Sequence, residues 1–182
     1  MMTTIEAPQR TAFQALINDY ADGDAWAHEQ LIHWLKTKPL EVMDQEVASS
    51  FPTIKKTLLH IWKTQLFWLD VLQKQQRSYT DGDAEAYYED DPDLSTLQVF
   101  DYLQHQSEAF TLFVRGLDEE ALQEKVSVVT PWFESYQPRY ELIQHCINHS
   151  TYHRGQLITM GRNLGMTDAP MTDFNFYLLQ VK

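Results

Sequence analysis

The sequence predicts an all-α protein that folds as a four-helix bundle. Four long stretches repeat apolar residues at helical spacing, over residues 8–37, 51–75, 94–117 and 138–165. The segments between them show no convincing strand pattern, and the chain contains only 6 glycines and 7 prolines. Because an amphipathic helix must bury its apolar face, four such helices in a row favour a bundle.

Length and composition indicate one domain with a complete core, since the chain has 182 residues, of which 43% are apolar and 13% aromatic. The net charge of −12 would repel phosphate backbones and anionic lipid, so we expect neither nucleic acid nor a membrane as partner. A single cysteine precludes an intramolecular disulfide and a cysteine-cage zinc site. With no signal-like N-terminus and no long apolar run, we expect a soluble, cytoplasmic protein.

The first two helices each carry a histidine of interest. The first helix is expected to have a joint at residues 22–24, and His28 falls on its buried side. We interpret His28 as a satisfied core or pocket residue, with replacement of His60 as a metal ligand as the alternative. In the second helix, for which Ser50 is the expected cap, His60 lies between the apolar side and a stripe of lysines. Trp62 is interpreted as core filling, or else as a wall of a pocket beside His60.

The connecting segments give weaker signals. Residues 77–93 form an acidic loop, which we interpret as solvated because Pro92 occupies the position where a calcium loop needs its glutamate. Asp93 is the expected cap of the third helix. Between the third and fourth helices, the run 126–129 could be extended. Within the C-terminal tail, residues 166–182, aromatic side chains are expected to cover an open end of the core.

The last helix contains three histidines at four-residue steps, His145, His149 and His153. Each step turns about 40° and climbs about 6 Å, so His149 and His153 fall at the edge of the apolar face and His145 lies further toward the polar side. Two imidazoles one turn apart can share a metal ion, which then needs a third ligand from another helix. A purely structural role for these side chains is the alternative. The zinc-protease motif is absent, since no glutamate follows either of the first two histidines.

Because bundles build metal sites from side chains on facing helices, His60 is the natural partner of His149 and His153. His145 is then a neighbour of the site or a surface residue. Arg154 either pairs with a carboxylate of a neighbouring helix or points into the cleft. Cys146 lies on the apolar face in mid-helix, where an inert buried thiol is expected.

The segment from Asn148 to Gln156, with its His-x-x-x-His-Arg-Gly-Gln run, resembles the C-terminal signature of the DinB/YfiT-like family. Residues 58–62 with 67–69 resemble the second-helix motif of that family, and 26–31 its first helix. The resemblance covers most of the chain, in order. It implies one domain over residues 1–182, an up-down-down-up four-helix bundle, and commonly a homodimer.

The same resemblance implies a divalent metal held by His60, His149 and His153. Three neutral imidazoles leave coordination positions open, which is the pattern of a catalytic site. Zn²⁺ or Ni²⁺ is our first choice, with Fe²⁺, Co²⁺ and Mn²⁺ as alternatives. Such a metal can activate water for hydrolysis, or hold a thiol as its thiolate.

Some members of the family transfer bacillithiol or mycothiol to an electrophile. We therefore expect a metal-dependent thiol S-transferase whose partners are a small-molecule thiol and an electrophile. One alternative is a metal-dependent hydrolase, although the sequence shows no obvious carboxylate base beside the histidines. The other is a stress protein that binds a metal or small ligand without turnover.

Overall fold

The computed structural model describes residues 10–74, 94–131 and 133–182, so the expected acidic loop at 77–93 lies outside the described residues. The third helix is capped by Ser95, so the prediction of Asp93 as its cap is wrong. Four long helices dominate the described chain: α1 (Ala12–Lys36), α2 (Ile54–Leu72), α4 (Thr96–Arg115) and α6 (Arg139–Asn163). The shorter elements are η1 (Leu40–Asp44), α5 (Glu119–Gln123), β1 (Lys125–Val129), β2 (Glu134–Pro138) and α7 (Phe174–Gln180).

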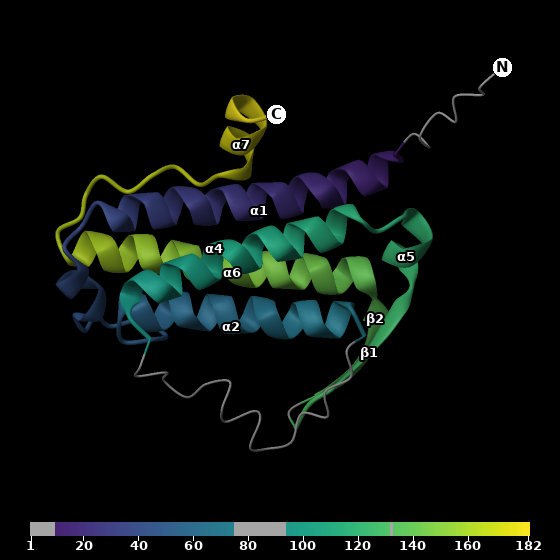
Figure 1. Ribbon diagram of the computed structural model, residues 1–182, viewed down its shortest axis with the longest axis horizontal. Coiled ribbons are helices and arrows are strands. Elements are labelled where there is room, and N and C mark those ends of the chain that lie inside the picture. The colour runs from purple at the N-terminus through teal and green to yellow at the C-terminus, as the bar shows by residue number, and fades with distance from the viewer. Residues whose placement is uncertain (1–9, 75–93, 132) are drawn as a thin grey trace.

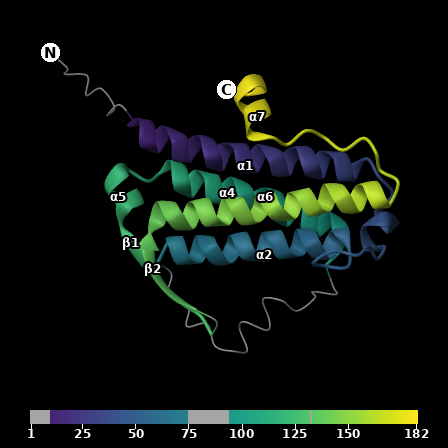
Figure 2. The ribbon, with the colours of Figure 1, turned by 180° about the vertical axis from the view of Figure 1, so that it is seen from behind.

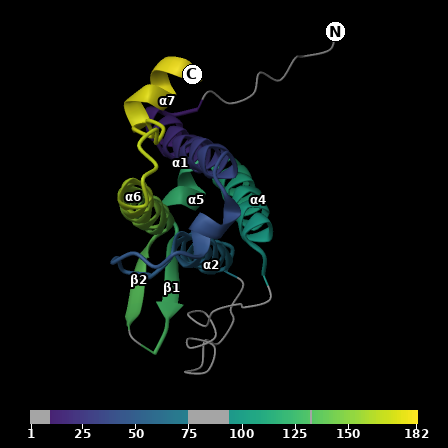
Figure 3. The same cartoon turned by 90° about the vertical axis from the view of Figure 1, so that its left-hand side faces the viewer.

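The four long helices form one bundle, in which α4 and α6 each lie between α1 and α2 (Figure 3). Helices α1 and α6 run in one direction, and α2 and α4 run in the other (Figure 1). Seen from behind, α6 lies between α1 and α2 along the length of the bundle (Figure 2). The four-helix bundle with up-down-down-up order is therefore confirmed, and α2 and α6 are neighbours along their length.

Local side-chain caps explain where the helices begin. Thr11 and Ser95 open α1 and α4 with capping boxes, in which the cap side chain and a glutamine three residues later satisfy each other's backbone donors. Helix α2 begins after Thr53, whose side chain accepts a hydrogen bond from the backbone of Lys56, so the prediction of Ser50 as its cap is wrong. Gly165 follows α6 at φ +86°, the left-handed conformation predicted for it.

A β-hairpin is the main addition to the expected fold. Strand β1 pairs antiparallel with β2, with Lys125 opposite Pro138, and β2 leads directly into α6. The extended run at 126–129 agrees with the sequence, and Val126 and Val128 alternate inward as a half-buried strand requires. The partner strand was not predicted, because its sequence, Glu-Ser-Tyr-Gln-Pro, has no apolar alternation.

The C-terminal helix α7 packs on the outer side of α1 (Figure 1). The prediction that the tail covers an open end of the core is therefore wrong. The ring of Phe174 stacks on Tyr20 with centroids 4.6 Å apart. A Cβ atom at Gly23 would lie 2.7 Å from the Phe174 ring, so the glycine permits this close approach. Helix α1 runs unbroken through this point, and the joint predicted at residues 22–24 is wrong.

The core consists of two apolar clusters that follow one another along the bundle. One includes Phe110 and Ile143, and the other includes Leu58 and Phe100. In each long helix, polar residues that are at most 5% exposed lie between the residues of one cluster and those of the other. This buried polar layer consists of Asp24 and His28 of α1, Gln65 of α2, Ser107 of α4 and Arg154 of α6.

The hydrogen bonds of the buried polar layer have a defined direction. Arg154 can only donate, and it pairs with Asp24 and donates to Nε2 of His28 at 3.2 Å. His28 must therefore carry its proton on Nδ1, which donates to the Ser107 hydroxyl at 2.8 Å. The Gln65 amide donates to Asp24 at 3.3 Å, and its carbonyl oxygen lies 3.2 Å from Ser107 Oγ. This chain of bonds joins all four long helices.

The titration of His28 gives a pH dependence of stability. Burial lowers the pKa of His28 to about 4, against the raising effect of Asp24, whereas an unfolded histidine titrates near 6.5. As the pH falls from about 6.5 to 4, the unfolded chain takes up a proton that the folded chain refuses. The free energy of unfolding should therefore fall by about 3 kcal/mol through this group. Urea titrations of wild type and His28→Asn at both pH values measure the difference, and an equal loss in both proteins would contradict it.

Two glycines of α6 provide a matched test of helix packing. A Cβ atom at Gly161 would lie 2.5 Å from Cη2 of Trp34, whereas one at Gly155 would meet nothing within 4 Å. Gly161→Ala should lower the free energy of unfolding by about 1–3 kcal/mol through overpacking. Gly155→Ala should raise it by up to about 1 kcal/mol through helix propensity. Urea denaturation distinguishes the two variants, and similar effects would show that α1 and α6 do not meet as described.

Candidate metal centre

Three histidines meet where α2 packs against α6. Nε2 of His149 lies 3.1 Å from Nε2 of His60 and 3.2 Å from Nε2 of His153. The two histidines of α6 share one face because they are four residues apart. One ring nitrogen from each of the three lies within 4.8 Å of the others. The structure therefore brings together the three residues that the sequence singled out.

The spacing of these nitrogens fits a divalent transition metal. Ligand bonds of about 2.0–2.1 Å in a tetrahedral site place two imidazole nitrogens about 3.4 Å apart, close to two of the separations observed here. Neutral imidazoles whose lone pairs converge on one point also gain from a cation at that point. Across the residues that the structure describes, this is the only group of three or more histidine, cysteine or acidic side chains placed to share a metal.

The surroundings keep the three imidazoles neutral. Burial and, after it, the neighbouring His149 and His153 together lower the pKa of His60 to about 3. Burial, followed by His153 and His145, lowers the pKa of His149 to about 4. Burial also lowers the pKa of His153, although its hydrogen bond to Gln156 acts in the opposite direction. At neutral pH the three imidazoles are thus uncharged, and each keeps one unprotonated ring nitrogen that is able to bind a metal.

Gln156 and Ser50 set the orientation of one histidine. Oε1 of Gln156 lies 2.8 Å from Nδ1 of His153, and its amide nitrogen donates to Oγ of Ser50 at 2.7 Å. With the amide nitrogen on Ser50, the carbonyl accepts the Nδ1 proton of His153. Nε2 of His153 therefore keeps its lone pair and points at the other two histidines.

Two aromatic side chains pack against the histidine group. Phe51, in the loop before α2, packs against His60 with ring centroids 4.3 Å apart and a tilt of 31°, and its ring centroid lies 5.8 Å from that of His153. Tyr152, which is 60% exposed, meets the ring of His153 edge-on at 4.9 Å. These contacts restrict the motion of the imidazoles.

The other histidines and Trp62 lie outside this group. His145 packs edge-on against Trp68 at 4.9 Å, and its ring is 6.4 Å from that of His149. His28 belongs to the buried polar layer, where both of its nitrogens have partners, so the alternative that it replaces His60 is wrong. Trp62 stacks on Tyr102 of α4, away from the α2–α6 contact.

Arg154 and Cys146 point into the bundle. Arg154 pairs with Asp24 of α1, which is the first of its two predicted interpretations. Cys146 is 1% exposed, and burial raises the pKa of its thiol well above the ordinary value. It is therefore a neutral buried thiol, as expected.

Sequence reasoning missed Gln156, Ser50 and Phe51. Gln156 could have been found, because it lies three residues after His153 and hence on the same helix face. Ser50 and Phe51 reach the histidines only through the path of the loop before α2, for which the sequence carries no signal.

The fold and the histidine group together define a class: four-helix-bundle proteins with a three-histidine group between two helices. The chain belongs to the DinB family, whose sequence model matches residues 15–180. It is 31% identical over 160 residues to the protein DinB of Bacillus subtilis strain 168, which covers 87% of this chain and 91% of that protein. The resemblance noted in the sequence is confirmed.

Two solved structures share the fold. A DinB-like protein from Bacillus cereus ATCC 10987 superposes with a TM-score of 0.63 at 19% identity, covering 84% of this chain and 94% of that one. YfiT from Bacillus subtilis, described as a probable metal-dependent hydrolase with an unusual four-helix bundle topology, also gives 0.63, at 12% identity over 88% and 94% of the two chains. In the described parts of the chain, no helix has the length and apolar character needed to cross a membrane.

The Gln156 contact predicts an effect on metal affinity. Gln156→Ala removes the acceptor that orients His153, and should weaken Zn²⁺ binding by about 10–100-fold without unfolding the protein. Gln144→Ala, at an exposed position of the same helix, is the matched control and should bind as wild type does. Competition with a chromophoric chelator measures both affinities. Equal affinities for the two variants would mean that Gln156 has no orienting role.

Proposed function

We propose that this protein is a metal-dependent enzyme that transfers a low-molecular-weight thiol to an electrophile. The observation that carries the proposal is the convergence of His60, His149 and His153 on one point. A divalent metal bound by these side chains would supply a Lewis acid that lowers the pKa of a coordinating thiol or water. Three protein ligands are the number typical of a catalytic rather than a closed structural site.

The side chains around the metal centre have distinct tasks in this proposal. The three neutral imidazoles bind without cancelling the charge of the cation. Gln156 holds Nε2 of His153 in position through its bond to Nδ1. Phe51 packs on His60 and excludes water from that side of the ring.

A thiol bound at this site would need no protein base. Within the described residues, burial and neighbouring histidines lower the pKa values of His60 and His149. For His153 the causes are burial and the Gln156 hydrogen bond. A thiol that loses its proton on coordination needs no such base, because its pKa already lies near 8.5 in water.

Metal-dependent hydrolysis is the second candidate. It is favoured by the similarity in fold to YfiT, which is described as a probable metal-dependent hydrolase. The same three imidazoles would serve it, since a histidine triad with an open position also suits activation of water. The two reactions differ in the nucleophile, which is a thiol in the transfer reaction and water in hydrolysis.

Metal content provides the first test. Protein purified without a histidine tag should contain about one equivalent of a transition metal, because three convergent imidazoles bind such ions tightly. The His149→Ala/His153→Ala variant should lose this metal and keep its helical circular dichroism. His145→Ala, in the same helix but outside the group, should retain it. Elemental analysis that finds no metal in wild type, even after reloading with Zn²⁺ and Ni²⁺, would contradict the proposal.

Activity assays separate the two reactions. Metal-loaded protein should accelerate the conjugation of thiols such as cysteine or glutathione to monochlorobimane, and a chelator should abolish the acceleration. A parallel assay with p-nitrophenyl esters tests hydrolysis. Acceleration of ester cleavage alone would select the hydrolase, and no acceleration of either reaction by metal-loaded protein would leave a binding protein without turnover.

A further inference from the structure

A cavity lies between α1, α4 and α7, on the side of the bundle opposite the α2–α6 contact that holds the histidines (Figure 3). Its volume is about 520 Å³, which is in the range of small-molecule sites. The members of one stripe of α1 line its floor at helical spacing: Asp22, Ala25, Trp26 and Glu29. Ala25 has no bulk beyond its Cβ, so the floor is open there.

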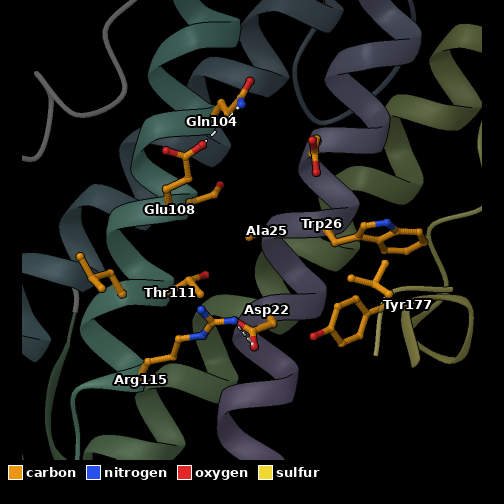
Figure 4. A pocket seen from close by; sticks show the side chains of 12 residues that line it. Asp22, Ala25, Trp26, Gln104, Glu108, Thr111, Arg115 and Tyr177 are labelled. Atoms are coloured by element: carbon orange, nitrogen blue, oxygen red, sulfur yellow. Dashed lines mark hydrogen bonds and ion pairs between the residues drawn. The ribbon is translucent and has the colours of Figure 1, made fainter. Parts of the chain in front are cut away.

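Helix α4 forms one wall of the cavity, and the rings of Trp26 and Tyr177 form the other wall (Figure 4). On the α4 side stand Gln104, Glu108, Thr111 and Arg115, which are again spaced along one helix face. The side chain of Trp26 points away from α4, and its ring centroid lies 6.0 Å from that of Tyr177 on α7 (Figure 4).

The docking of α7 completes the cavity. Tyr177 is only 6% exposed, and Phe174 one turn earlier is seated against Gly23 of α1. A residue with a side chain at position 23 would collide with Phe174, so the place of α7 on α1 is specified by the sequence. Tyr177 is therefore brought to the cavity by the packing of α7 on α1.

The charges in the cavity are predominantly negative. Arg115 forms an ion pair with Asp22, in which Nη2 and Oδ2 lie 2.8 Å apart. Oδ1 of Asp22 is buried and has no hydrogen-bond donor among the described residues. Glu29 and Glu108 also line the cavity, are exposed, and form no ion pair within the described part of the chain. The lining of the cavity thus contains three carboxylates and a single guanidinium.

We propose that this cavity binds a small organic cation with an aromatic or apolar body. The cationic nitrogen would lie beside Glu29 and Glu108, and the body would lie against Trp26, because Tyr177 is only 6% exposed and its ring packs against Trp26 and Phe174. The indole of Trp26 provides apolar contact area for the body of the ligand. An anion would meet the excess of carboxylates. A bare metal ion would lack a ligand cage here, since the described residues form such a group only at the histidines.

The test uses three probes of similar size and different charge. Isothermal titration calorimetry of the full chain should detect binding of 2-phenylethylammonium, and much weaker binding of neutral 2-phenylethanol and anionic 3-phenylpropanoate. Glu29→Gln and Glu108→Gln should each weaken binding of the ammonium probe by about tenfold. Glu120→Gln, an exposed change of the same charge on α5, should leave it unchanged.

A second arm separates this cavity from the metal centre. Binding of the ammonium probe should be the same with chelator present and in the His149→Ala/His153→Ala variant. Loss of binding in that variant would place the amine on the metal and overturn the proposal. Equal affinities for the three probes, or equal effects of Glu108→Gln and Glu120→Gln, would overturn it as well, because either result would mean that the cavity does not recognise the cation.

Discussion

The buried ion pair between Arg154 and Asp24 is the constraint on which the candidate metal centre depends. An uncompensated charge at this depth would cost about 3–5 kcal/mol, so Arg154 must point to the middle of the bundle, where Asp24 lies. Successive residues of a helix differ by about 100° in direction. Once Arg154 points inward toward α1, its neighbour His153 has to point toward α2. The rotation of α6 about its axis, and with it the meeting of the histidines, follows from the pair.

The buried polar layer also fixes the helices along their length. Two apolar clusters alone would tolerate small slides of one helix past another, since apolar contacts have little directional preference. The bonds from Arg154 to His28 and from His28 to Ser107 form in one register only, because their donors and acceptors stand on three different helices and must lie level with one another. A slide of one turn would leave these groups buried without partners. The layer therefore holds His60 level with His149.

The four long helices could be predicted from hydrophobic periodicity in the sequence, because their apolar faces repeat over many turns. It also placed the three histidines, since four-residue steps keep side chains on one face. It failed for Gly23, which looks like a break in a helix but makes room for a ring from the far end of the chain. It failed for Ser50 and Thr53, both of which can cap a helix, and only the path of the loop decides between them. Strand β2 has no pattern of its own and exists through its pairing with β1.

The order of the helices separates His60 from His149 by 89 positions in the chain, although their rings touch in space. A cation held by both would act as a clip that closes a very long loop, and the entropy of such closure is large for the unfolded chain. In that chain only the neighbours in α6 could still share the ion. For such a clip, affinity for the cation and the stability of the whole bundle would be linked equilibria, and an excess of the ion would raise the melting temperature by mass action.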